Sequence, residues 1–203
     1  MTGVGGQGIV KAGQIIGRAV TSFGLNAVMS EIHGMSQRGG IVGVDLRIGN
    51  VYGPIIPNGV ADLLIGFEAA ETVRALNRIG KNTTILMSTE KIFPVSVSLG
   101  DFSYPDTDEI GSRLKERGAR LYMIDAPRLA VEAGNFQSTN VVLVGAAYSA
   151  GFIPVPLSAL KEAVKEVFHE RSWESNLRSL ELGIEEFKIL QSERHEAVAA
   201  QTN

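Results

Sequence analysis

Gly3-Val4-Gly5-Gly6-Gln7-Gly8 opens the sequence, and the residues that follow it, up to Val20, carry apolar side chains at a spacing of three and four. This spacing is typical of a helix with one apolar face. Glycines let a backbone approach a phosphate closely, and the N–H groups and dipole at a helix N-terminus favour negative charge. The opening segment therefore predicts a glycine loop that leads into a helix and offers a site for an anion.

The glycines match a known spacing. Gly3, Gly5 and Gly8 fit the G-x-G-x-x-G pattern of dinucleotide-binding folds. Glu31 follows near the end of the second expected strand, where such folds place the acid that holds a ribose. Only two residues precede Gly3, so the strand that should lead into the loop is expected to be missing. A tight turn that binds no ligand is the structural alternative.

Short apolar runs and helical patterns alternate along the chain. Strands are expected at 26–30, 63–65, 84–87 and 121–124, and helices at 68–77 and 106–117. Two alternating runs, 41–48 and 51–56, flank Gly49-Asn50 and predict a β-hairpin, so the sheet should be mixed. This order indicates an α/β fold: a three-layer, Rossmann-like mixed sheet with helices on both faces.

The last third of the sequence is expected to be helical. The β-branched residues at 141–144 favour a strand, whereas Asn140 as an N-cap favours a helix, which we prefer. Apolar residues share one face in 158–170 and again in a second helix that ends near 190, which predicts a C-terminal helical pair. Residues 1–191 then form a single domain, and the polar ending 192–203 should fray.

Composition excludes several classes of protein. The chain has 203 residues, 44% of them hydrophobic and 20% charged, so it should fold into a globular domain. A net charge of -3 provides no general attraction for nucleic acid or an anionic membrane. The absence of cysteine excludes a disulfide, a thiolate nucleophile and a cysteine-ligated iron–sulfur cluster within this chain. No targeting or membrane segment is recognisable, so we expect a cytoplasmic protein.

A second candidate site lies in residues 30–40, which combine an acid, an imidazole, a guanidinium and three glycines. Arg38, followed by Gly39 and Gly40, could bind a phosphate or carboxylate, with Glu31 orienting the guanidinium. His33 fits a positioning role better than proton transfer, because nothing beside it in sequence resembles a catalytic triad. The alternative is a loop in which Arg38 simply pairs with Glu31.

Three acids around the expected strand at 63–65 suggest a divalent cation site. They are Asp62, Glu68 and Glu71. Acids at the end of a strand and the start of a helix are more often caps or solvated partners of the helix dipole, and we prefer that interpretation.

The glycine loop and the segment Glu31-Ile32-His33-Gly34-Met35-Ser36-Gln37-Arg38-Gly39-Gly40 resemble the gamma-type domain of 2-oxoacid:ferredoxin oxidoreductases. The resemblance continues through residues 52–57, 61–68, 140–146 and 176–183, and thus covers nearly the whole chain. Within this family, the histidine-containing version of residues 33–40 is most similar to the indolepyruvate type, in which the small beta subunit carries this domain.

The resemblance implies a non-redox subunit of a thiamine-diphosphate-dependent enzyme. Such an enzyme decarboxylates an arylpyruvate, transfers the acyl group to coenzyme A and passes electrons through iron–sulfur clusters to ferredoxin. It implies that this chain alone binds no cofactor, because a large catalytic partner subunit carries the thiamine diphosphate and the clusters. The isolated chain would be inactive, with a homodimer as its expected assembly.

The resemblance also implies a set of site residues. Gly5, Gly6, Gln7 and Gly8 would present backbone donors, and Glu31, His33, Arg38, Gly39 and Gly40 would face the partner or coenzyme A. No residue here is expected to be catalytic. The chain departs from the family at its amino end, where relatives carry an apolar strand before the glycine loop, and we expect the natural protein to start several residues upstream. An independent dinucleotide-binding protein and a purely structural subunit are the alternatives.

Overall fold

The fold is described by a computed structural model that covers residues 1–34, 40–93, 97, 100, 103–116 and 119–202. Six strands form one sheet: β1 (Thr2–Val4), β2 (Ala27–His33), β3 (Ile41–Ile48), β4 (Ala61–Gly66), β5 (Ile79–Ser88) and β6 (Arg120–Ile124). The α-helices are α1 (Ile9–Ser22), α2 (Ala69–Arg74), α4 (Thr107–Glu116), α5 (Ala126–Glu132), α6 (Thr139–Ser149), α7 (Leu157–Val167) and α8 (Trp173–Thr202). Short 3₁₀ turns are η1 (Leu76–Arg78), η2 (Phe136–Ser138) and η3 (Glu170–Ser172).

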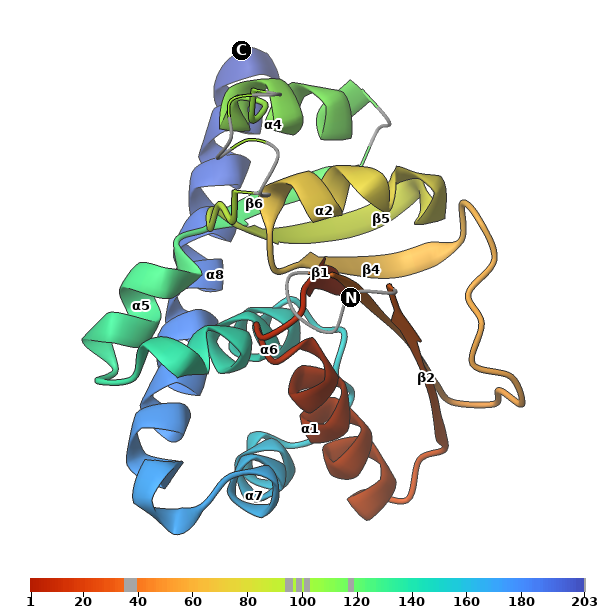
Figure 1. Ribbon diagram of the computed structural model, residues 1–203, viewed down its shortest axis with the longest axis vertical. Helices are drawn as coiled ribbons and strands as arrows, with labels where there is room; N and C mark the ends of the chain where they lie inside the picture. Colours follow the sequence, from red (N-terminus) through yellow and green to blue (C-terminus); the bar gives the residue numbers. More distant parts are fainter. Residues whose placement is uncertain (35–39, 94–96, 98–99, 101–102, 117–118, 203) are drawn as a thin grey trace.

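The sheet is mixed, with strand order β2-β3-β1-β4-β5-β6. Strands β1, β4, β5 and β6 run parallel, and their connections carry helices, as parallel pairing requires. Strand β3 is antiparallel to both β1 and β2. Helices α2 and α4 cover one face of the sheet, and α1, α5, α6 and α7 lie on the other (Figure 1). The predicted three-layer α/β fold is therefore confirmed.

Alternating side chains of the parallel strands build a separate core on each face. Leu64, Ile85 and Met87 pack under α2 and α4, whereas Ile65 and Leu86 belong to the larger core shared with α1 and α6. Strands buried on both faces read as continuous apolar runs, which is why 63–65 and 84–87 stood out in the sequence. The arrangement leaves the two ends of the sheet for loops.

The strand before the glycine loop is present, contrary to expectation, but it is short. Strand β1 contains Gly3 itself and occupies a central position between β3 and β4. A Cβ at Gly3 would lie 2.6 Å from Gln7 Oε1 and 2.8 Å from Phe67 Cβ. Only glycine therefore lets the strand pass beneath the loop it leads into.

The predicted hairpin at Gly49-Asn50 is wrong, because β3 pairs with β2 and residues 51–56 form no strand. Side chains from the neighbouring strands hold this segment as a loop instead. Asp45 Oδ2 accepts from Ile56 N at 3.0 Å, and Arg47 Nη1 donates to Gly53 O at 3.0 Å. Pro54 also removes a ladder donor from the segment.

The C-terminal third is helical, including 141–144, where the preferred interpretation is confirmed. The two C-terminal helices are α7 and α8, but α8 packs mainly on α6 and α7 mainly on α1. Trp173 fixes the corner between α7 and α8, since its Nε1 donates to Lys165 O and Phe168 O at 3.0 and 2.9 Å. Helix α8 continues to Thr202, through the segment for which fraying was predicted. Within the described ranges, no helix is both long and apolar enough to span a bilayer.

Candidate functional site at the carboxyl ends of the strands

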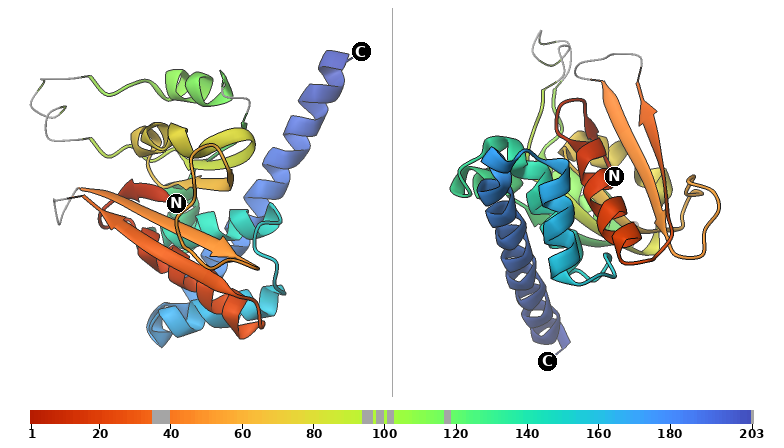
Figure 2. Two further views of the ribbon diagram at one scale, coloured as in Figure 1. Left: turned by 90° about the vertical axis from the view of Figure 1, so that its right-hand side faces the viewer. Right: turned by 90° about the horizontal axis from the view of Figure 1, so that it is seen from below.

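The glycine loop lies where the parallel strands end. Residues 5–8 follow β1, Glu68 follows β4, and Glu90 follows β5. Ligands of open α/β sheets bind in crevices at this edge. The end of β2, the start of β3, and the chain segments on either side of residues 94–102 reach out on this same side of the sheet (Figure 2). This edge of the sheet therefore carries the glycine loop, the chain segments that follow β2 and β5, and several acidic side chains.

Gln7 connects the glycine loop to β1 and to the residues that follow β4 and β5. Its Oε1 accepts from Val4 N at 2.8 Å, and its Nε2 donates to Phe67 O at 2.8 Å and to Glu90 Oε2 at 2.9 Å. Val4 N, Phe67 O and the Glu90 carboxylate are thus satisfied by one amide side chain. The loop is therefore held rigidly, as a preformed binding surface must be.

The loop presents its glycines in two different ways. Gly6 has a φ of +106° and no atom within 4 Å of the place that a Cβ would take, so this side of the loop is open. Gly8 has a φ of +76° and packs on α6, where Asn140 Nδ2 donates to its carbonyl at 3.1 Å. Gly8 is also the N-cap of α1, and no described side chain caps that helix. The first-turn N–H groups of α1 are thus oriented towards the open edge.

Glu68 connects the chain segment between β5 and α4 to the start of α2. The residue is 1% exposed, and its Oε2 accepts from Glu71 N at 2.8 Å as the N-cap of α2. Its Oε1 accepts from the Tyr104 hydroxyl and, at 3.3 Å, from Ile92 N. The capping interpretation of Glu68 is therefore confirmed. The same carboxylate also binds a residue near each end of the segment between β5 and α4.

Two carboxyl groups at this edge have raised pKa values. Burial raises the pKa of Glu71, opposed by the Arg74 guanidinium and reinforced by the negative charge of Glu68. Burial also raises the pKa of Glu90, opposed by the hydrogen bond from Gln7. In the described part of the chain Glu71 Oε2 accepts no hydrogen bond, although it is buried. The edge therefore holds negative charge under partial desolvation.

Glu71→Gln should raise the free energy of unfolding at pH 7, because it removes a charge whose burial is unfavourable. Because the pKa of Glu71 is higher in the folded chain than in the unfolded one, the folded chain takes up this proton first as pH falls. The cost of burying the charge therefore exists only above the ordinary pKa of 4.5. The gain should therefore shrink as pH falls towards 4.5 and vanish below it. Urea unfolding of both chains between pH 4 and pH 7 measures this, and a gain that does not change with pH would contradict it.

Comparison with known proteins identifies the fold's family. The family model described as pyruvate ferredoxin/flavodoxin oxidoreductase matches residues 1–186. The chain belongs to this family. Indolepyruvate oxidoreductase subunit IorB of Archaeoglobus fulgidus is 40% identical over 183 residues, which make up 90% of this chain and 91% of that subunit. The subunit of the same name in Methanothermobacter thermautotrophicus is 40% identical over 181 residues, which make up 89% and 92%. The chain is thus a subunit of the 2-oxoacid:ferredoxin oxidoreductase type.

Solved structures of oxidoreductases share the fold. The gamma subunit of keto/oxoacid ferredoxin oxidoreductase from Geobacter sulfurreducens has a TM-score of 0.68 at 20% identity and covers 93% of this chain and 96% of its own. The 2-oxoglutarate:ferredoxin oxidoreductase of Magnetococcus marinus has a TM-score of 0.71 at 22% identity, and the match covers 93% of this chain and 30% of that longer one. The fold therefore occurs both as a separate subunit and within a larger oxidoreductase chain.

The structure brings only some of the predicted site residues of this oxidoreductase subunit together. Gly5 N donates to Gly40 O at 2.8 Å, so the loop and the second candidate segment meet. Glu31 and His33 form an exposed pair, with 3.0 Å between Oε2 and Nε2, near the end of β2. Arg38 and Gly39 lie outside the described residues, so the predicted pairing of Arg38 with Glu31 stays a prediction.

Glu31 is placed wrongly for the ribose of a dinucleotide at the glycine loop. Strand β3 lies between β1 and β2, so Glu31 belongs to a strand two positions away from the loop. Strands are spaced by about 4.8 Å, which separates the two strand axes by roughly 10 Å. The sequence spacing that suggested this role took β2 for the direct neighbour of β1.

The cation site, which was the less favoured interpretation of Asp62, Glu68 and Glu71, is not supported, because these acids lie apart. Asp62 lies at the start of β4, whereas Glu68 and Glu71 lie at the opposite end of that strand. Among the described residues, no group of three or more histidines and acids could hold a metal ion. Glu90 and Tyr104 belong to the site and were not predicted. The position of Glu90 immediately after an apolar strand was a usable signal, whereas nothing in the local pattern marked Tyr104.

Proposed function

We propose that this chain is the small, non-redox subunit of an enzyme that oxidatively decarboxylates indolepyruvate or another arylpyruvate. The reaction converts the 2-oxoacid and coenzyme A into an acyl-coenzyme A and carbon dioxide, and two electrons pass singly to ferredoxin. The observation that carries the proposal is the 40% identity to indolepyruvate oxidoreductase subunits along nine-tenths of both chains. The lower identity to the pyruvate/ketoisovalerate common gamma subunit of Pyrococcus furiosus, 24%, favours the indolepyruvate type.

The cofactors of this reaction would belong to a large partner subunit. An iron–sulfur cluster is held by cysteine thiolates, and this chain has no cysteine. Thiamine diphosphate would supply the carbanion chemistry in the partner. The residues of this chain do not fit an iron–sulfur cluster, and we derive no chemical step from this chain.

The carboxyl-end edge would face that partner and the coenzyme A. Within the described residues, Gly5 N already donates to Gly40 O and Gln7 N to Val4 O, so the backbone donors offered to a ligand would be those of Gly6 and Gly8. The Gln7 side chain holds this loop in place. Glu31 and His33 extend the same end of the sheet. Arg38 and Gly39 are assigned to this surface by sequence alone. Binding of anionic groups would rely on N–H donors and the α1 dipole, against the negative charge of Glu68 and Glu90.

Co-purification of the chain from its native cells tests the proposal. A cysteine-rich, thiamine-dependent partner, together with reduction of ferredoxin or viologen that requires arylpyruvate and coenzyme A, supports it. A chain that purifies alone, lacks this activity and binds a nicotinamide or flavin nucleotide would support the independent dinucleotide-binding protein. Light scattering on the isolated chain shows whether it is a homodimer.

Gly6→Ala should lower arylpyruvate-dependent activity or partner affinity at least tenfold. The added methyl group enters the open space above the loop, where the partner or coenzyme A would approach. Strain at positive φ should cost the isolated chain only about 1–3 kcal/mol. The measurement is activity and partner binding in the reconstituted complex, at a temperature where the isolated variant remains folded.

Gly24→Ala is the matched control. Gly24 also has a positive φ, +82°, and open space around its missing Cβ, but it follows the other end of α1. It should lose similar stability and keep full activity. Equal activity of the two variants would contradict a role for the loop in contact with the partner. Loss of assembly without any change in coenzyme A dependence would favour a purely structural subunit.

A further inference from the structure

Strand β2 forms an edge of the sheet, and among the described residues no strand pairs with its outer side. It pairs with β3 in an antiparallel register that runs from Ala27 to His33 without a bulge. The other edge strand, β6, is protected, because α8 packs against it and the Arg194 guanidinium lies 5.3 Å from the centre of the Tyr122 ring. Folded proteins protect long edge strands by covering them or by placing lysine, proline or a bulge in them. Strand β2 contains none of these three features.

The backbone groups on the outer side of β2 follow from its register with β3. Gly34 N donates to Ile41 O at 2.8 Å, and Gly49 N donates to Asn26 O at 2.9 Å. These two pairs continue the register by one residue at each end of β2, so Asn26 and Gly34 both face β3. Along an antiparallel strand the direction of the N–H and C=O groups alternates from residue to residue. The even-numbered residues of β2 therefore bind β3, and the outward N–H and C=O groups belong to residues 27, 29, 31 and 33.

A second copy of β2 can match all of these outward groups in one antiparallel register, in which Ser30 lies opposite Ser30 of the second copy. Met29 then lies opposite Glu31, and Ala27 lies opposite His33. Every outward-facing residue meets another outward-facing residue, and each such pair exchanges two backbone hydrogen bonds, about eight in all. The two Glu31 residues are diagonal neighbours rather than directly opposed, and each carboxylate lies 3.0 Å from His33 of its own chain. The strand is therefore complementary to itself.

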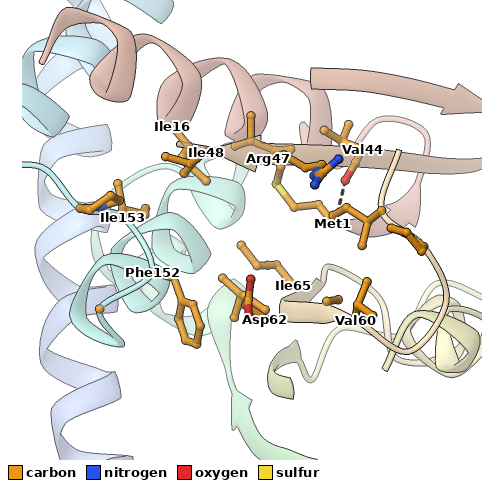
Figure 3. A pocket seen from close by; sticks show the side chains of 17 residues that line it. Met1, Ile16, Val44, Arg47, Ile48, Val60, Asp62, Ile65, Phe152 and Ile153 are labelled. Carbon is orange, nitrogen blue, oxygen red and sulfur yellow. Dashed lines mark hydrogen bonds between the residues drawn. The ribbon is translucent and has the colours of Figure 1, made fainter. Parts of the chain in front are cut away.

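The side chains of β2 divide between a face under α1 and an open face. Figure 3 shows Ile16 of α1 close to Ile48 of β3, which packs against the core that contains Ile16. Ala27 lies opposite Ile48 in the register, so the odd-numbered residues of β2 face α1. Ile32 lies on the other face and is 51% exposed. In the paired register it lies opposite Val28 of the second copy, which gives this exposed side chain an apolar neighbour.

The position of α1 agrees with a second copy beside β2. The helix makes similar contact with β2 and β3, so its axis lies about one strand spacing from a two-fold axis between the two β2 strands. The two α1 helices would then be roughly 10 Å apart, which is an ordinary distance for packed helices. A Cβ at Gly13 would lie 2.7 Å from Met29 Sδ, and Gly17, one turn later, has no atom within 4 Å of its missing Cβ. The side of α1 nearest β2 therefore leaves room for another helix.

We propose that two copies of this chain pair through their β2 edges, antiparallel and about a two-fold axis at Ser30, so that the two six-stranded sheets become one continuous sheet. The outward backbone groups of each β2 bind the other copy, and the two α1 helices lie side by side on one face. This pairing uses the backbone of Glu31 and His33 and leaves the glycine loop outside the contact. The proposal does not rest on the substrate proposed above.

Cysteine cross-linking tests the register, because the chain has no cysteine of its own. The two Ser30 residues form a non-hydrogen-bonded pair with Cα atoms about 4.5 Å apart, within the range that a disulfide spans. Ile32 lies on the same face of the same strand, but roughly 13 Å along the strand from Ile32 of the second copy. Mild oxidation should therefore link Ser30→Cys chains at least tenfold faster than Ile32→Cys chains. Equal or reversed rates would overturn the proposal.

Charge exchange at the same position provides a test without oxidation. Ser30→Lys places two ammonium groups opposite each other, and Ser30→Asp places two carboxylates there, so each variant alone should dissociate at least tenfold more readily than Ser30→Thr. An equimolar mixture of the two charged variants should restore the dimer, because opposite charges then face each other, and this recovery also shows that both are folded. Analytical ultracentrifugation measures the three dissociation constants. A mixture as monomeric as its components, or a monomeric Ser30→Thr chain, would overturn the proposal.

Amide hydrogen exchange identifies what covers the edge. In the chain alone, exchange at Met29 and Glu31 should slow at least tenfold as the concentration rises through the dissociation constant of the dimer. The amides of Val28 and Ser30 bind β3 and should exchange equally at all concentrations. Protection of the outward amides only after the large partner subunit is added would overturn the proposal, since the edge would then accept a strand of that subunit. No substrate is used, so the result is independent of arylpyruvate activity.

Discussion

Gly183→Ala should destabilise the chain by about 3 kcal/mol or more and prevent α8 from docking in its present position. A Cβ at Gly183 would lie 2.0 Å from the carbonyl oxygen of Val142 and 2.8 Å from its carbonyl carbon. Both are backbone atoms of α6, which cannot rotate away as a side chain can. Residues 141–147 are all buried, so α6 has no room to shift towards the sheet. Urea unfolding, followed by far-ultraviolet circular dichroism, measures the loss.

Gly17→Ala provides the control for this prediction. Gly17 lies inside α1, and no atom lies within 4 Å of its missing Cβ. The same substitution should therefore stabilise the chain by up to about 1 kcal/mol, because alanine is the better helix former. Gly145 of α6 makes the corresponding close approach to α8, where an added Cβ would lie 2.2 Å from Leu180 O. The double variant Gly145→Ala/Gly183→Ala should lose less stability than the sum of the losses of the two single variants. Full additivity would contradict a shared contact.

Local periodicity was sufficient to predict the layers of the fold. The apolar runs at 63–65, 84–87 and 121–124 lie within β4, β5 and β6, because strands covered by helices on both faces have no polar alternation. The partner of 41–48 could not be predicted in the same way. Gly49-Asn50 favours a hairpin locally, but bonds from Asp45 and Arg47 hold residues 51–56 as a loop. Those side chains also look like ordinary polar positions of an alternating strand.

The site shows the same division between local and distant information. The glycine pattern predicted the loop and the helix that follows it. The partners of Gln7 could not be predicted, since Phe67 and Glu90 lie 60 and 83 residues away in sequence. Glu31 failed as a ribose ligand because strand order, which no local pattern contains, places β3 between it and the loop.

Gln7→Glu should be the most damaging single-atom change at the loop. The new carboxylate would still accept from Val4 N, but it would lose both donations and face the Phe67 carbonyl and the Glu90 carboxylate. Two acceptors would be left unpaired and two like charges would lie within hydrogen-bonding distance. We expect a loss of about 1–3 kcal/mol at pH 7, because Gln7 and Glu90 are partly buried and polar groups there would lose their partners. The loss should shrink as pH falls towards 5, when one proton can be shared between the two carboxyl groups.

Exchange of the pair separates this electrostatic effect from a general loss of packing. In the double variant Gln7→Glu/Glu90→Gln, the new amide at position 90 can donate to the carboxylate at position 7, so the repulsion is removed and one hydrogen bond returns. Phe67 O still lacks its donor, and recovery should therefore be incomplete. Unfolding free energies of the four chains form a double-mutant cycle. A coupling near zero would mean that Gln7 and Glu90 act independently, whereas strong coupling makes the link between the β1 loop and the end of β5 an energetic constraint on the shape of the edge.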